Sequence, residues 1–179
     1  MTTRQQYVDA WGIDNIFEFP RAEFIEEFRA PVESYPEIDF IPTDMSVVFT
    51  SYLEGGKYSL YDSINLRIAD DEFMPLVIIG AVPSDPDSAL FCFDANGGRV
   101  VLLGTEAGTL ELVNSTFKAL SDFLYQFALF IDADTGIDGR AQRASVLFEK
   151  LRSIDEAAFK NPESWWTVAL TQLGATLSR

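Results

Sequence analysis

The chain has 179 residues, 47% of them hydrophobic, and 13 basic against 28 acidic side chains give it a formal charge of −15. This length and composition predict one domain over residues 1–179 with a sizeable core. A protein with this negative charge repels the phosphate backbone of nucleic acids, so no direct binding to nucleic acid is expected. No run reaches the ~20 apolar residues that a bilayer-spanning helix needs, and the first residues lack the apolar segment of a signal peptide. We therefore expect a cytoplasmic protein that does not bind membranes.

The N-terminal third predicts short helices and little regular sheet. A helix is expected at residues 3–10, and a second runs from Pro20 to Pro31, since a proline suits the first turn of a helix. Residues 32–42 are expected to be extended and irregular.

The next segment predicts three short strands. Two are expected at residues 46–49 and 58–61, joined by a hairpin turn at 54–57. A weaker strand is expected at residues 65–68, followed by an acidic loop at 69–72.

The strongest structural signal is a set of apolar runs of strand length, at residues 76–80, 89–93 and 99–103. Asn96-Gly97 separates the last two, and Asn-Gly between such runs is a strong hairpin signal. A fourth run at residues 109–113 alternates apolar and polar side chains, which predicts one buried and one wet face. Leu110 and Leu112 are expected on one face, and Thr109 and Glu111 on the other. The pattern predicts an antiparallel meander.

Helices are expected after the meander. Asn114-Ser115 offers N-cap side chains for a helix over residues 116–131, and a second amphipathic pattern covers 140–151. Residues 153–156 resemble a capping box, and Asn161-Pro162-Glu163 predicts the start of a last helix. That helix is expected to bury one of two adjacent tryptophans together with three aliphatic residues: Trp165 or Trp166, Val168, Ala169 and Leu173. Helices, meander and helices indicate an α+β fold, a central and mostly antiparallel sheet flanked by N- and C-terminal helices.

No catalytic constellation is present in the sequence. The absence of histidine excludes His-based triads and His metal ligands, and one cysteine excludes a thiolate zinc site and an internal disulfide. Cys92 lies within an apolar run and is expected in the core. We expect no enzyme, no catalytic residue, no cofactor and no metal site.

Residues 132–139 alternate acidic side chains like a calcium loop. In either possible register, however, the last ligand position holds Arg143 or Ser145 instead of the glutamate that such loops need. An ordinary acidic turn between helices is expected there.

Several segments resemble the SUKH superfamily of bacterial immunity proteins, most closely its fourth group. The resemblance lies in four consecutive segments: Met74–Gly80, Leu90–Asp94, Gly98–Leu103 and Val113–Phe117. Residues 162–166 are similar to the tryptophan-bearing C-terminal helix of that group. The match is best over residues 74–170. It is weak in the N-terminal third, and Thr116 replaces the second serine of the group's Val-Asn-Ser-Ser step.

The resemblance implies an α+β protein of the cytosol that neutralises a cognate toxin by binding it, the toxins of the family being typically nucleases or nucleic-acid deaminases. Because such toxins have basic clefts, an acidic inhibitor can occupy one as a phosphate mimic. The predicted contact residues are acidic side chains in expected loops: Asp70, Asp71, Glu72, Asp85 and Asp87, with Asp132, Asp134 and Asp138 as a second patch. Tyr58, Tyr61 and one of Trp165 and Trp166 are candidate buried anchors of such an interface.

Two alternatives remain open at the level of sequence. The first is a non-catalytic scaffold or regulatory adaptor on the same fold, which binds a cellular protein unrelated to toxins. The second is a carboxylate-dependent hydrolase or metal protein, because the separation of two carboxylates is a property of the fold.

Overall fold

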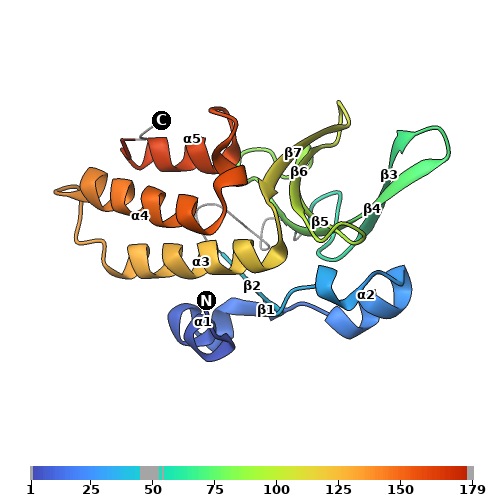
Figure 1. Cartoon of the computed structure of the whole chain (residues 1–179), viewed down its shortest axis with the longest axis horizontal. Coiled ribbons are helices and arrows are strands. Elements are labelled where there is room, and N and C mark those ends of the chain that lie inside the picture. The colour runs from blue at the N-terminus through green and yellow to red at the C-terminus, as the bar shows by residue number, and fades with distance from the viewer. Residues whose placement is uncertain (1, 45–52, 54, 177–179) are drawn as a thin grey trace.

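A five-stranded antiparallel sheet is the centre of the computed structural model, which describes residues 2–44, 53 and 55–176 (Figure 1). Its strands lie in chain order, so each pairs with the next through a short connection. They are β3 (Ser63–Ala69), β4 (Glu72–Ala81), β5 (Ala89–Asp94), β6 (Val100–Gly104) and β7 (Thr109–Asn114). The predicted meander and α+β class are confirmed, and the weaker strand expected at 65–68 is part of β3.

The turn between β5 and β6 is organised by Asp94. Its carboxylate accepts hydrogen bonds from the backbone N–H groups of Asn96 (3.1 Å) and Gly97 (2.9 Å) and forms an ion pair with Arg99 (3.0 Å). Gly98 follows with φ of +71°, a conformation that glycine adopts without steric cost. These local contacts explain why the hairpin could be predicted from sequence.

Three helices form a layer beside the sheet: α3 (Phe117–Asp132), α4 (Arg140–Ile154) and α5 (Trp165–Gln172) (Figure 1). Apolar side chains of α3 pack on the same sheet face as Phe93, whose ring meets that of Phe117 edge-on at 5.7 Å. Trp166 is fully buried in this core, against Phe123 and Phe127. The predicted burial of a tryptophan in the last helix is confirmed, whereas Val168 is exposed.

The N-terminal segment packs against the same core. Its elements are α1 (Arg4–Trp11), β1 (Ile16–Glu18), α2 (Arg21–Phe28) and β2 (Phe40–Pro42), with 3-10 turns at Ile13–Asn15 and Val32–Ser34. The two helices confirm the sequence prediction to within a few residues. The antiparallel pairing of β1 with β2 is new, because part of the segment expected to be irregular forms a strand.

The second face of the sheet is also covered. Leu76, Ile78, Leu90 and Cys92 form a separate apolar cluster there, against which Tyr58, Leu60, Ile64, Leu66 and Met74 pack. Cys92 is therefore in the core, as expected, and its burial raises the pKa of its thiol to about 12. The side chain is protonated and unreactive at neutral pH.

Several local predictions are wrong. Residues 58–61 form no strand: they bend, and Tyr61 has a φ of +69°, which interrupts an extended chain. The strand expected at 46–49 lies outside the described residues, and so does part of the turn at 54–57. In β7 the face predicted to be wet turns toward α5, since Glu111 accepts a hydrogen bond from the backbone N–H of Trp165 at 2.6 Å.

The helix caps also differ from the prediction. Thr116, not Asn114 or Ser115, caps α3 by accepting from the N–H of Ala119 at 3.0 Å. No capping box forms at residues 153–156, because α4 continues through Ile154. Helix α5 starts one turn later than expected, with Ser164 as its N-cap residue, while Asn161 accepts a hydrogen bond from Glu163 in the preceding turn.

Candidate partner-binding surface

The first group of predicted contact residues lies at the end of the β3–β4 hairpin. Asp70 and Asp71 form the turn and Glu72 begins β4, and all three side chains are exposed. Asp71 adopts a φ of +62°, which aspartate tolerates better than most residues. Asp70 accepts a hydrogen bond from Arg67 at 2.8 Å, but both partners lie in solvent. An exposed pair of this kind is weak and leaves the acidic character of the turn intact.

The second group, Asp85 and Asp87, lies in the loop between β4 and β5. Both residues are exposed. The Asp87 carboxylate accepts a hydrogen bond from the backbone N–H of Lys57 at 2.9 Å, and its carbonyl accepts one from Thr105 at 3.2 Å. Asp87 thus holds three neighbouring segments together, which gives its carboxylate a structural role whatever else it binds.

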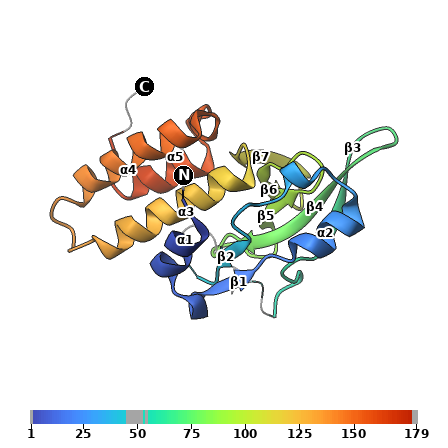
Figure 2. The same ribbon diagram turned by 60° about the horizontal axis from the view of Figure 1, so that its bottom comes forward.

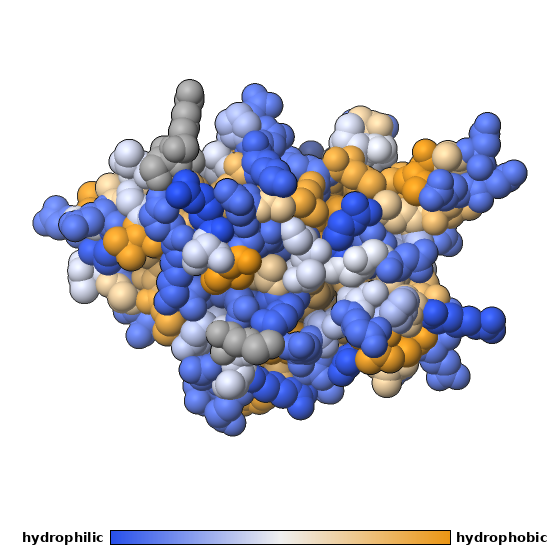
Figure 3. Space-filling view, in the orientation of Figure 1, coloured by the Kyte–Doolittle hydropathy of each residue, from blue (hydrophilic) through white to orange (hydrophobic). Residues whose placement is uncertain are grey.

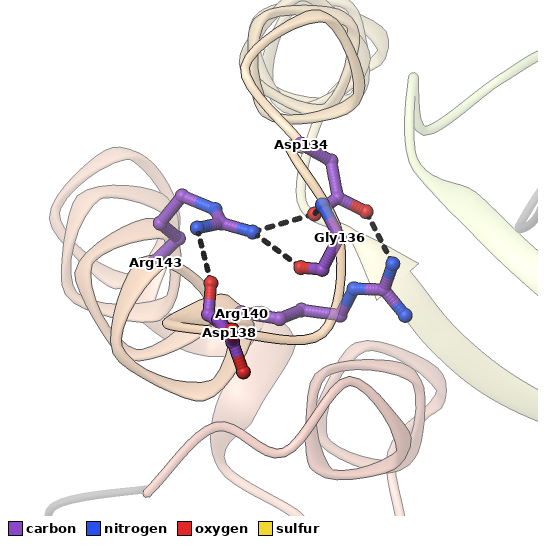
Figure 4. Close-up of polar contacts among 5 residues, drawn as sticks. All are labelled: Asp134, Gly136, Asp138, Arg140 and Arg143. Atoms are coloured by element: carbon purple, nitrogen blue, oxygen red, sulfur yellow. Dashed lines mark hydrogen bonds and ion pairs between the residues drawn. The ribbon is translucent and has the colours of Figure 1, made fainter.

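The third group lies in the loop between α3 and α4, where Asp134 is held by two arginines (Figure 4). Its carboxylate contacts Arg140 at 2.6 Å and Arg143 at 2.5 Å. Arg143 also donates to the backbone carbonyls of Gly136 and Asp138, so it fixes the whole turn. The acidic turn expected here is confirmed, but the guanidinium groups of Arg140 and Arg143 offset most of the negative charge of this loop. Asp132 and Asp138 are exposed.

These arginines hold the pKa of Asp134 below its usual value, mainly through the hydrogen bond from Arg140. The bonds to the ionised form contribute stability above the unfolded pKa of about 3.9 and are lost as the pH falls through the lower folded pKa. We expect the Arg140→Gln variant to raise the Asp134 pKa in a carboxyl-carbon NMR titration. Arg152→Gln serves as the control, because Arg152 pairs with Glu149. An Asp134 midpoint unchanged by Arg140→Gln would contradict this assignment.

The three acidic groups do not form one surface. The hairpin turn and the β4–β5 loop lie at opposite ends of β4, whose ten residues span about 30 Å. Figures 1 and 2 both place the α3–α4 loop at the end of the molecule opposite the β3–β4 hairpin. A single partner of ordinary interface size would meet one of these ends, not all three groups.

Each candidate aromatic anchor has contacts within the protein. Trp166 is fully buried, and the Trp165 ring packs edge-on against Phe91 at 5.0 Å. Tyr61 donates a hydrogen bond to the carbonyl of Glu18 at 2.7 Å, and Tyr58 is partly buried on the second face of the sheet. These contacts give the rings a role in the fold, and Tyr58, Tyr61 and Trp165 stay partly exposed beside them.

Sequence reasoning missed a buried polar network around Asp155. The Asp155 carboxylate accepts hydrogen bonds from the Ser115 backbone N–H (2.7 Å), the Ser115 hydroxyl (2.8 Å) and the Asn114 amide (3.2 Å). The Asn114 side chain in turn accepts from the indole N–H of Trp166 at 3.0 Å. The network joins the end of β7 to the residue after α4 and to α5. Buried polar side chains are hydrogen-bonded in folded proteins, but sequence does not reveal the partner when it lies 40 residues away.

Residues 2–44, 53 and 55–176 contain no group of three or more His, Cys, Asp or Glu side chains placed to hold a metal ion. Within the same residues, every helix is too short or too polar to cross a bilayer.

The fold and its surface define a class: an α+β domain with a packed antiparallel sheet and with acidic loops at both ends of the molecule. Its polar motif residues Asn114 and Ser115 form hydrogen bonds within the protein. Among known families, the model of the SUKH-4 immunity proteins matches residues 2–172. The chain therefore belongs to the SUKH-4 immunity protein family. Comparisons with curated proteins and with solved structures gave no match.

The family match extends the sequence prediction. The fourth group of the superfamily was expected from residues 74–170, and the match includes the N-terminal third as well. That extent agrees with the structure, in which Tyr7, Phe19 and Phe24 belong to the main core. The segments that carried the resemblance are structural, since Asp94 organises a turn and Asn114 and Ser115 bind Asp155.

Proposed function

We propose that this protein neutralises a cognate toxin that acts on nucleic acid, by binding over the toxin's basic cleft in the cytoplasm of the cell that it protects. The observation that carries the proposal is the match to immunity proteins over residues 2–172, joined to a formal charge of −15. An enzyme that acts on nucleic acid binds phosphates through basic side chains, and an acidic protein surface complements them. Inhibition then needs no chemistry from this chain, only occupation of the cleft.

The direct test is survival of cells that express the toxin encoded beside this gene, with and without this chain. We expect growth only when both are present, and a complex when the purified proteins are mixed. Toxicity that this chain does not relieve, or the absence of any toxin reading frame beside the gene, would contradict the proposal and favour an adaptor with another protein partner.

The electrostatic part of the proposal predicts a strong dependence on salt. Complementary charges steer the encounter of two proteins, and added salt screens that attraction. We expect the association rate constant with the toxin to fall at least ~10-fold from low to high ionic strength, with a smaller change in the dissociation rate. Stopped-flow or surface-plasmon measurements give both constants. An affinity that does not change with salt would exclude the mimicry of phosphates.

A further inference from the structure

The β3–β4 hairpin extends beyond the rest of the sheet. Strand β5 pairs with β4 only as far as Leu76, so the rungs Leu66–Met74, Arg67–Phe73 and Ala69–Glu72 belong to a two-stranded ribbon. Pro75 marks the end of the pairing with β5. Its carbonyl accepts a hydrogen bond from the backbone N–H of Ala95, but proline has no backbone N–H to donate one back. We call residues 66–74 the ribbon. They project from one end of the molecule in both cartoon views (Figures 1 and 2).

The ribbon exposes large apolar side chains next to its acidic turn. Phe73 is 55% exposed and Ile68 is 45% exposed. Arg67, opposite Phe73 on the neighbouring strand, is exposed too. In the space-filling view, apolar residues at this end of the sheet lie beside the hydrophilic residues of the hairpin end (Figure 3). Exposed aromatic residues on a projecting element are typical of contact sites, because burying such a ring supplies much of the energy of an interface.

Charge identifies the kind of partner. Asp70 and Asp71 form the turn, Glu72 follows it as the first residue of β4, and Arg67 is the single cation of residues 66–74. The ribbon therefore has a negative end with apolar side chains directly behind it. This combination suits a basic, concave protein surface, which would receive the carboxylates inside and the apolar residues at its mouth.

The acidic groups of the β4–β5 loop and the α3–α4 loop are weaker candidates for a contact site, because each has a carboxylate bound within the protein. Asp134 is neutralised by two arginines, and Asp87 holds three segments of its own chain together. Two strands placed about 5 Å apart are also narrow enough to enter a cleft, which a loop lying flat on the surface cannot do.

We propose that the ribbon is the element that enters the basic cleft of the cognate toxin, with Phe73 and Ile68 as apolar anchors and Asp70, Asp71 and Glu72 in place of substrate phosphates. This inference rests on the proposed function and specifies the binding surface. Phe73 acts after the encounter, so it sets the dissociation rate. The three carboxylates act before contact, so they set the association rate.

The test measures binding of the purified full-length chain to the toxin encoded beside its gene, with the unaltered chain measured first. We expect Phe73→Ala to weaken binding about 30-fold or more, mainly through faster dissociation. A triple variant, Asp70→Asn, Asp71→Asn and Glu72→Gln, is expected to slow association about 10-fold at low salt. Asparagine also tolerates the positive φ of residue 71, so this variant retains the turn.

The matched control is Ile137→Ala. Ile137 is 83% exposed and lies in the α3–α4 loop, at the other end of the molecule. We expect it to leave both rate constants unchanged, and thermal unfolding to show that all variants are folded. If the unaltered chain binds the toxin but Phe73→Ala binds equally well, the ribbon is not the contact element and the proposed function stands. If the unaltered chain does not bind, the proposed function fails and this inference fails with it.

Discussion

The Asp155→Ala variant is expected to lose about 3 kcal/mol of folding free energy. The substitution removes one carboxylate and leaves three donors without an acceptor: the Ser115 N–H, the Ser115 hydroxyl and the Asn114 amide. Asp155 is 7% exposed and Asn114 is fully buried, so water replaces these bonds poorly. For a chain of this length the loss corresponds to a fall in Tm of about 6–12 °C. Calorimetry or urea unfolding measures it.

Glu156→Ala is the control for this effect. Glu156 follows Asp155 directly but is exposed, so its loss is expected to change stability by less than about 0.5 kcal/mol. If the two variants unfold at the same temperature, the network does not hold α4 and α5 against the sheet. Toxin binding by the folded fraction of Asp155→Ala is expected to be unchanged, because Asp155 and Asn114 are buried and lie outside the ribbon.

The parts of the fold that sequence predicts are those with local causes. The meander follows from apolar runs and from a turn in which Asp94 binds the N–H groups two and three residues later. By contrast, Asn114 and Ser115 carry the side chains of N-caps, but their partner Asp155 lies about 40 residues away and was brought there by tertiary packing. Thr116 caps the helix instead. The pairing of β1 with β2 was missed because each strand has three residues, too few for a periodic pattern.

For the candidate surface, the sequence predicted the exposure of the acidic residues but not their partners. Charge density selected acidic residues that are in fact mostly exposed, because several carboxylates in a short loop have few ways to be buried. It did not reveal which of them have partners. Arg140 and Arg143 follow Asp134 by six and nine residues at the start of a helix, a spacing that could have indicated this ion pair. The aromatic Phe73 was overlooked since an exposed ring cannot be told from a core ring by sequence.

The Gly98→Ala variant is expected to lose about 3 kcal/mol, a comparable effect with a different cause. Two costs add. The φ of +71° is unfavourable for any residue with a Cβ atom, and that atom would lie 2.8 Å from the carbonyl oxygen of Ser34 and 3.1 Å from its Cα. Because both obstacles are backbone atoms, no side-chain rotation relieves them. The β5–β6 turn or the segment around Ser34 has to move, which loosens the N-terminal segment from the sheet.

Gly108→Ala separates the two costs. Gly108 has a similar φ of +62°, but a Cβ atom there meets nothing within 4 Å. We expect this variant to lose only the conformational part, about 1 kcal/mol, so the difference between the two variants measures the contact with Ser34. Chemical unfolding of both proteins gives the two values under the same conditions. Equal losses would mean that the β5–β6 turn does not hold the N-terminal segment through this close approach, and that its attachment depends on Tyr7, Phe19 and Phe24 in the core.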